Sequence, residues 1–231
     1  MEHGGPGGSR ALRRAEKGLS AIAIRVVICD FGGVLTTPLF HAFARVQEES
    51  GIPFEALGKA LHRITVEDGA HPLYELEKGH MSEPDFVARL EQAVSAEVGR
   101  HVAMHEFSER YWAHLHPNDD LIAYMAALRD RGYRMAMLTN NVREWEPRWR
   151  AMLPVDEIFE LIVDSAFVGM RKPDPEIYEL TCERLGVKAG ECAFLDDIEL
   201  NCQTARELGM TAVRFEETAQ AIAALEAVLA S

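Results

Sequence analysis

Residues 22–33 read IAIRVVICDFGG, so an apolar run ends in a carboxylate, an aromatic residue and two glycines. Such a run is typical of a buried strand in an open α/β sheet, where ligands bind at the carboxyl ends of parallel strands. We therefore expect Asp30 at the tip of a strand, in a position to act on a ligand.

Three further segments carry polar groups in comparable places. They are MAMLTN at 135–140, GMRKPDP at 169–175 and CAFLDD at 192–197. The first apolar run ends in Thr139 and Asn140 and the last in Asp196 and Asp197, while Lys172 lies in the proline-containing loop between them. Two carboxylate tips, a hydroxyl tip and a lysine predict a site for a phosphoryl group and a divalent cation.

Strand and helix signals alternate from about residue 118 to the end of the chain. Asn118 or Asp119 is placed to cap one helix, and Asp174 to cap another whose first position is Pro175. Helices that alternate with short apolar strands predict an α/β fold with a doubly wound, mainly parallel, Rossmann-like sheet.

Residues 38–116 follow another pattern, with apolar stripes at helical spacing and almost no strand signal. Ser82 is placed to cap one of these helices. The pattern predicts a helical cap inserted after the first strand of a core domain, which residues 21–37 and 117–231 would form. Residues 1–20, rich in glycine at their start, are expected to be a disordered leader.

Composition narrows the classes of partner. A formal net charge of −13 over 231 residues disfavours nucleic acid as a partner. No run approaches the roughly 18 apolar residues of a membrane span. The four cysteines form no close Cys-x-x-Cys pair, so we expect small buried thiols and a cytoplasmic protein. The pattern leaves the oligomeric state open.

The four segments, in this order, resemble the haloacid dehalogenase-like hydrolases over about residues 24–215. Residues 194–210 are similar to the N-terminal phosphatase domain of soluble epoxide hydrolase. Residues 169–178 are similar to the same group and to bacterial glucose-1-phosphate phosphatases. The resemblance implies a Rossmann-like core whose helical cap closes over the site and selects the substrate.

It also implies a role for each polar group. Asp30 would be the nucleophile that attacks phosphorus and forms an aspartyl-phosphate. Thr139 and the backbone N–H of Asn140 would bind the phosphoryl oxygens. Lys172 would neutralise negative charge between Asp30 and the phosphate.

Mg²⁺ is the expected cofactor, and its ligands would be oxygen atoms. Asp30, the main-chain carbonyl of Gly32 and Asp197 would supply three of them. Asp196 would be a further ligand or a supporting group. Asn201, about one helical turn after Asp197, would orient that loop.

Phe31 and Gly32 are expected to contact the substrate, and Gly32 departs from the family pattern. Most relatives with phosphatase activity have an aspartate there, which protonates the leaving oxygen and later activates water. A histidine or glutamate of the cap would replace it, or the enzyme would favour esters with good leaving groups. We expect Arg171 to be solvated and Trp145 to pack in the core or at an interface.

Three functions stay open at this point. The leading hypothesis is a Mg²⁺-dependent phosphomonoesterase of a small phosphorylated metabolite. A 2-haloacid dehalogenase would attack carbon without metal, but the pair Asp196–Asp197 would repel its carboxylate substrate. A phosphoryl-binding protein without catalysis is the third. The epoxide hydrolase likeness suggests lipid phosphates, and the bacterial likeness, slightly preferred, suggests sugar phosphates.

Overall fold

The structure is a computed structural model that describes residues 23–104 and 106–230. The expected leader at residues 1–20 lies outside the described residues, so its prediction stays untested.

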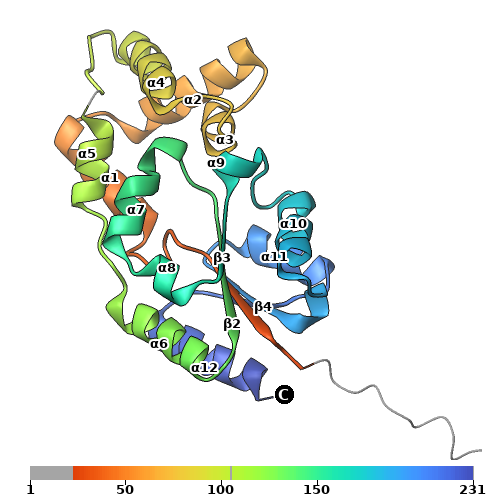
Figure 1. Cartoon of the computed structure of the whole chain (residues 1–231). Coiled ribbons are helices and arrows are strands. Elements are labelled where there is room, and N and C mark those ends of the chain that lie inside the picture. The colour runs from red at the N-terminus through yellow and green to blue at the C-terminus, as the bar shows by residue number, and fades with distance from the viewer. Residues whose placement is uncertain (1–22, 105, 231) are drawn as a thin grey trace, which may run out of the picture.

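Within the described residues, five parallel strands form one sheet in the order β3-β2-β1-β4-β5 (Figure 1). The strands are β1 (Val26–Cys29), β2 (Arg134–Thr139), β3 (Leu161–Asp164), β4 (Cys192–Asp196) and β5 (Thr211–Arg214). The first strand in the chain is therefore the central one, and the order reverses on either side of it. This arrangement confirms the predicted doubly wound α/β fold.

Helices cover both faces of the sheet because side chains alternate along each strand. Val27 and Cys29 pack with the helices of one face, while Val26 and Ile28 pack with those of the other. The first face carries α6 (Asp119–Asp130), α7 (Glu146–Met152), α8 (Val155–Ile158) and α12 (Thr218–Leu229). The second carries α10 (Pro175–Leu185) and α11 (Glu199–Glu207). Short turns of helix lie at α9 (Ser165–Val168), η1 (Arg143–Trp145) and η2 (Ala189–Glu191).

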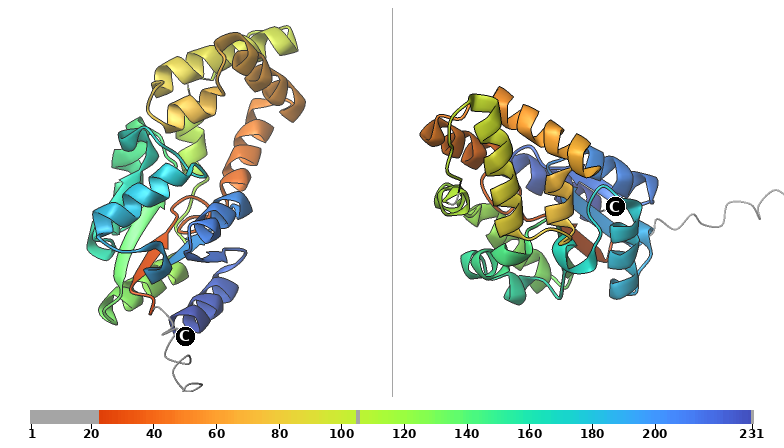
Figure 2. Two further views of the ribbon diagram at one scale, coloured as in Figure 1. Left: turned by 90° about the vertical axis from the view of Figure 1, so that its right-hand side faces the viewer. Right: turned by 90° about the horizontal axis from the view of Figure 1, so that it is seen from above.

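Five helices lie between β1 and α6 in the chain, and we call them the cap helices. They are α1 (Leu39–Ser50), α2 (Phe54–Asp68), α3 (Pro72–Glu77), α4 (Glu83–Val98) and α5 (Phe107–Ala113). They gather at one end of the molecule, beyond the carboxyl ends of the strands (Figures 1 and 2). Their own apolar clusters hold them together, so they form a unit that can cover the sheet edge.

Local capping follows the sequence in two of three predicted places. The side chain of Asn118 accepts a hydrogen bond from Leu121 N, and that of Ser82 from Asp85 N. Asp174 occupies the expected N-cap position of α10, but its side chain makes no capping bond, so that part of the prediction is wrong. Among the described helices, none combines the length and the apolar character needed to cross a membrane.

Candidate active site

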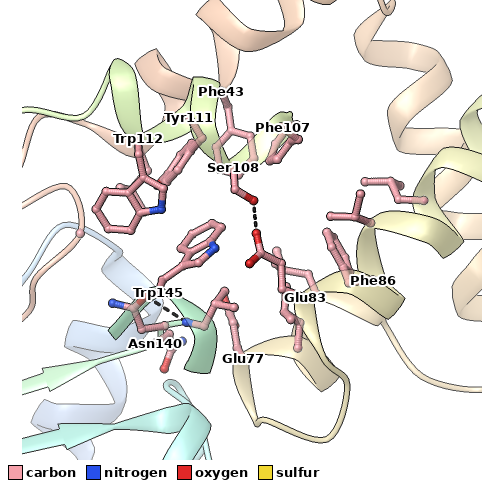
Figure 3. Close-up of a pocket in the computed structure, with 18 of the residues that line it drawn as sticks. Phe43, Glu77, Glu83, Phe86, Phe107, Ser108, Tyr111, Trp112, Asn140 and Trp145 are labelled. Atoms are coloured by element: carbon pink, nitrogen blue, oxygen red, sulfur yellow. Dashed lines mark hydrogen bonds between the residues drawn. The ribbon is translucent and has the colours of Figure 1, made fainter. Parts of the chain in front are cut away.

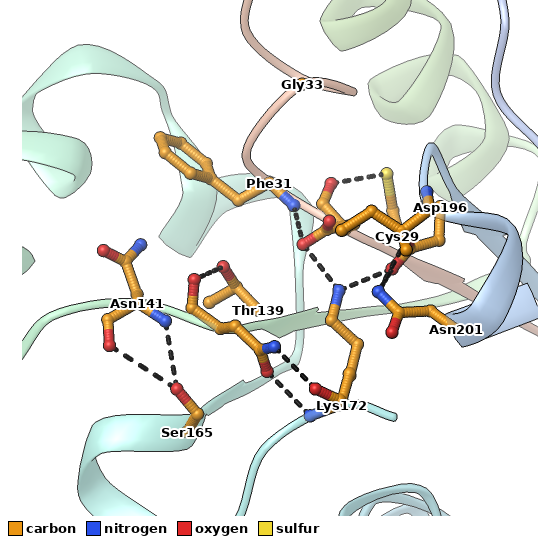
Figure 4. Close-up of polar contacts among 12 residues, drawn as sticks. Cys29, Phe31, Gly33, Thr139, Asn141, Ser165, Lys172, Asp196 and Asn201 are labelled. Carbon is orange, nitrogen blue, oxygen red and sulfur yellow. Dashed lines mark hydrogen bonds and ion pairs between the residues drawn. The ribbon is translucent and has the colours of Figure 1, made fainter. Parts of the chain in front are cut away.

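A buried lysine joins the tips of two neighbouring strands (Figure 4). Lys172 Nζ lies 2.8 Å from Asp30 Oδ1 and 2.6 Å from Asp196 Oδ2, and its side chain is 1% exposed. Burial alone would lower the pKa of Lys172, but Asp196 and Asp30 outweigh it and hold that pKa above its ordinary value. The lysine is therefore a fixed cation between two carboxylates.

Asp196 is held on every side by donors. The backbone N–H of Ile198 donates to its Oδ1 at 2.8 Å, and Asn201 Nδ2 lies 3.0 and 3.1 Å from its two oxygens. With Lys172 on Oδ2, both oxygens of this buried carboxylate are engaged. Of the two roles left open for Asp196, these contacts favour the supporting one, and they bring the Asn201 side chain against Asp196.

Three carboxylates crowd the same edge of the sheet. Single oxygens of Asp30, Asp196 and Asp197 lie within 4.8 Å of one another. Burial raises the pKa of Asp30 and of Asp197, and the neighbouring carboxylates raise both further, against the opposing effect of Lys172. One lysine does not balance three such charges, and hard oxygen donors are the set that Mg²⁺ prefers. The residues present therefore fit a divalent cation.

Gly33 is required by this crowding. Its φ is +79°, and a Cβ atom there would come within 2.5 Å of Asp197 Oδ2. A side chain at this position would be strained and would displace the carboxylate. Gly32 differs, because its φ is not in the left-handed region. The atoms nearest to an added Cβ would belong to the flexible side chain of Leu39, the nearest being Cδ1 at 2.9 Å.

The tip of β2 lies beside the lysine loop. Thr139 is buried at the end of that strand. The Asn140 side chain donates to the carbonyl of Lys172 at 2.9 Å and accepts from its N–H at 2.8 Å. These two bonds fix the loop that carries the lysine. The sequence assigned Asn140 a backbone role only, so the function of its side chain was missed.

Arg171 is not solvated as expected. Its Nε lies 2.6 Å from Glu77 Oε2, both side chains are largely buried, and its guanidinium stacks on the Tyr74 ring at 4.0 Å. The cap helix α3 supplies both partners and covers the arginine. Glu77 is 94 positions away in the chain, so no local signal could have indicated the pair.

Two residues at the carboxyl end of β3 were also missed. Asp164 lies opposite Thr139 in the strand register and caps α9 through Ala166 N at 3.0 Å. Ser165 Oγ accepts from Asn141 N at 3.0 Å (Figure 4). It also donates to the carbonyl of Glu77 at 2.6 Å. This hydroxyl connects the edge of the sheet to the cap.

A pocket of about 240 Å³ lies between the cap helices and the sheet edge (Figure 3). Phe31, Gly32 and Asn140 border it on the core side, and the cap lines it mostly with aliphatic and aromatic side chains. Trp145 borders it as well, rather than only packing in the core. No histidine is among the described residues of this lining, whose carboxylates are Glu77 and Glu83.

Comparison with known proteins agrees with this arrangement. The family of haloacid dehalogenase-like hydrolases matches residues 24–209. The chain belongs to this family. This HAD-like hydrolase is 28% identical to bifunctional epoxide hydrolase 2 of Rattus norvegicus over 219 residues. The aligned segment covers 90% of this chain and 39% of that protein. It is 27% identical to phosphatase MT3486 of Mycobacterium tuberculosis, over 86% of this chain and 90% of that one.

Solved structures share the fold. A HAD family enzyme of Bacteroides thetaiotaomicron, in complex with magnesium and inorganic phosphate, superposes with a TM-score of 0.62 at 22% identity, over 84% of this chain and 95% of that one. The L-2-haloacid dehalogenase of Xanthobacter autotrophicus superposes with a TM-score of 0.58 at 20% identity, over 89% of this chain and 82% of that one. A phosphate-binding enzyme and a haloacid dehalogenase thus share this fold, and function depends on the site rather than on the fold.

Proposed function

We propose that this HAD-like hydrolase is a Mg²⁺-dependent phosphomonoesterase whose nucleophile is Asp30. The observation that carries the proposal is the buried contact of Lys172 with Asp30 and Asp196, beside the third carboxylate of Asp197. Such a site attracts a cation and then a phosphoryl group, and its lysine faces the nucleophile. The phosphatase names among the relatives and the magnesium and phosphate of the solved HAD enzyme support it.

The reaction divides into two displacements. The Asp30 carboxylate attacks phosphorus, an Asp30–phosphoryl bond forms, and the bond to the ester oxygen breaks, so that the alcohol leaves with a proton that comes from water. Water then attacks phosphorus, which releases phosphate and returns the carboxylate. Lys172 holds Asp30 in place and offsets the charge of the phosphoryl oxygens. Mg²⁺, held by Asp30 and Asp197, would neutralise charge on the transferring group.

The pocket argues against the slight preference for sugar phosphates. The hydroxyl groups of a sugar would lie against the leucine, phenylalanine and tryptophan side chains that form most of its wall. Polar groups buried without hydrogen bonds reduce affinity. We infer that the organic part of the substrate is mainly apolar. A chain or ring of modest size fits a volume of about 240 Å³.

Phosphate release from a panel of alkyl and aryl phosphates, in Mg²⁺ and in EDTA, tests the proposal. We expect turnover in Mg²⁺ that EDTA abolishes, and rates that rise with the length of the alkyl chain. Each buried methylene is worth about 0.8 kcal/mol, or about fourfold in kcat/KM while the pocket has room. No phosphate release from any ester would contradict the proposal.

The dehalogenase alternative is tested in the same experiment. Asp196 and Asp197 lie beside the nucleophile, and their charge opposes a carboxylate substrate unless a cation is bound. Chloride release from 2-chloropropionate in EDTA would favour that function. A protein that only binds phosphoryl ligands would bind Mg²⁺ and phosphate without turnover.

A further inference from the structure

A polar pair interrupts the apolar wall of the pocket. Ser108 of α5 donates a hydrogen bond to Glu83, which begins α4, and both side chains line the cavity (Figure 3). The Ser82 cap fixes the start of α4, and the Glu83 backbone N–H is bonded to Glu144 at 3.2 Å. A carboxylate is thus held at a defined place among hydrocarbon groups.

An indole N–H faces this pair. Trp145 stacks on Tyr111, with ring centroids 5.2 Å apart, and meets Trp112 edge to face at 5.5 Å, so its ring has a fixed orientation. Its Nε1 is buried and finds no hydrogen-bond partner among the described residues. Figure 3 shows the indole nitrogen of Trp145 pointing toward the Glu83 carboxylate from the other side of the cavity.

A donor and an acceptor that face each other select the chemistry of what lies between them. Trp145 Nε1–H only donates, and an ionised Glu83 only accepts. A hydroxyl group accepts from the first and donates to the second. An ammonium group cannot accept, and a second anionic group would be repelled by Glu83. A buried donor without a partner is costly, so an occupant that satisfies it gains affinity.

We propose that Trp145 and Glu83 bind a hydroxyl group on the apolar organic part of the substrate. This inference rests on the proposed phosphatase function. It narrows the substrate class to monophosphates of apolar alcohols that carry a second hydroxyl group. Since Phe31, Gly32 and Asn140 border the same cavity, the phosphate faces the nucleophile while the second hydroxyl lies at Trp145. The separation of the two groups is then fixed, and one position along the chain is preferred.

The test compares octyl phosphate with the positional isomers of hydroxyoctyl phosphate, each of which carries one additional hydroxyl group at a different carbon of the chain. In the wild type, one isomer should exceed octyl phosphate in kcat/KM by about three- to tenfold, the effect of one or two hydrogen bonds. Trp145→Phe removes the N–H and keeps a ring. It should abolish this preference, so that the ratio of kcat/KM between the hydroxylated ester and octyl phosphate falls to about one.

Two further variants sharpen the comparison. Glu83→Ala should also abolish the preference. Trp112→Phe is the matched control, because its Nε1 is likewise buried without a partner in the described structure, yet it lies on the other side of Trp145 from Glu83. This control should keep the preference. The assignment would be overturned if Trp112→Phe lost the preference while Trp145→Phe kept it. It would also be overturned if Trp145→Phe lowered kcat/KM equally for both esters.

The outcomes separate this inference from the proposed function. Hydrolysis of octyl phosphate in Mg²⁺ with no preference for any hydroxylated isomer would support the phosphatase function and overturn the hydroxyl site. Water would then be the hydrogen-bond partner of Trp145. If no ester is hydrolysed, calorimetric titration with free octanediols and octanol decides. Tighter binding of one diol, lost in Trp145→Phe, would support the site, and equal binding would overturn it.

Discussion

The side chain at position 32 decides which leaving groups the proposed phosphatase can release. An aspartate there would supply positioned acid–base help, and Gly32 supplies none. The carboxylates of the pocket are placed for other tasks, since Glu77 pairs with Arg171 and Glu83 with Ser108. The proposed phosphatase therefore depends on a leaving oxygen of low basicity, or on water that reaches the site through the same pocket.

Gly32→Asp should raise the rate on alkyl phosphates. Acid–base help is worth roughly 10²–10⁴-fold, and we expect the lower part of that range because Leu39 must move to admit the new side chain. Rates across a series from nitrophenyl to alkyl phosphates should become less steep in the variant than in the wild type. Gly32→Ala is the matched control, with a Cβ but no carboxyl group. Equal slopes in all three proteins would contradict this reading.

At the scale of elements, the short helix α9 connects the sheet edge to the cap. It follows the tip of β3, and Asp164 caps it with one oxygen while the other, Oδ2, lacks a partner among the described residues. Arg143 donates to the carbonyl of Ala166, and Ser165 to that of Glu77, so α9 contacts both η1 and α3. The stability of this connection depends on a buried carboxylate.

Asp164→Asn should stabilise the protein above pH 6. Burial raises the pKa of Asp164 to about 6, so the folded state holds the proton more tightly than the unfolded state does. Stability from this group is fully present below pH 4 and is lost as the pH rises through 6, by at most about 3 kcal/mol. Asparagine keeps the capping oxygen without the charge.

Urea denaturation of both proteins at pH 4.5 and pH 7.5 measures the effect. The variant should gain stability at pH 7.5 and little at pH 4.5. Asp174→Asn is the matched control, because this exposed N-cap residue makes no side-chain capping bond. A gain of equal size at the two pH values would mean that the Asp164 charge is not the cause.

The elements also show what could be predicted from the sequence. Asp30, Thr139 and Asp196 each follow an apolar run, so local pattern and the rule for strand tips bring them to one edge. The pair of Arg171 with Glu77 depends on how α3 docks on the core, which no local pattern encodes. The same docking makes Trp145 a wall of the pocket. Long-range packing of the cap was therefore the part that remained out of reach.

The whole molecule combines a net charge of −13 with three carboxylates at one sheet edge. A divalent cation bound there reduces their repulsion and stabilises the folded state by mass action. The cap brings an apolar pocket to the same edge, so the charged and apolar parts of the proposed phosphate ester would meet different surfaces. In the proposed phosphatase, metal binding and substrate choice thus belong to different parts of the fold.

Mg²⁺ at saturating concentration should raise the melting temperature. A stabilisation of about 2 kcal/mol corresponds to roughly 4–8 °C for a chain of this size. Asp197→Ala should lose this rise, whereas Asp120→Ala, which removes an exposed carboxylate of α6, should keep it. Thermal unfolding with and without EDTA makes the comparison. A rise that survives in Asp197→Ala would place the cation elsewhere.

The central claim is that Asp30 accepts the phosphoryl group, and an acid-quenched single turnover tests it most directly. Wild-type protein mixed with Mg²⁺ and an aryl phosphate, quenched and digested, should carry one phosphoryl group on the peptide that contains Asp30. Asp30→Asn should carry none and should release phosphate only at background, while its melting temperature shows that it is folded. A phosphoryl group on another residue, or undiminished phosphate release by Asp30→Asn, would contradict the account.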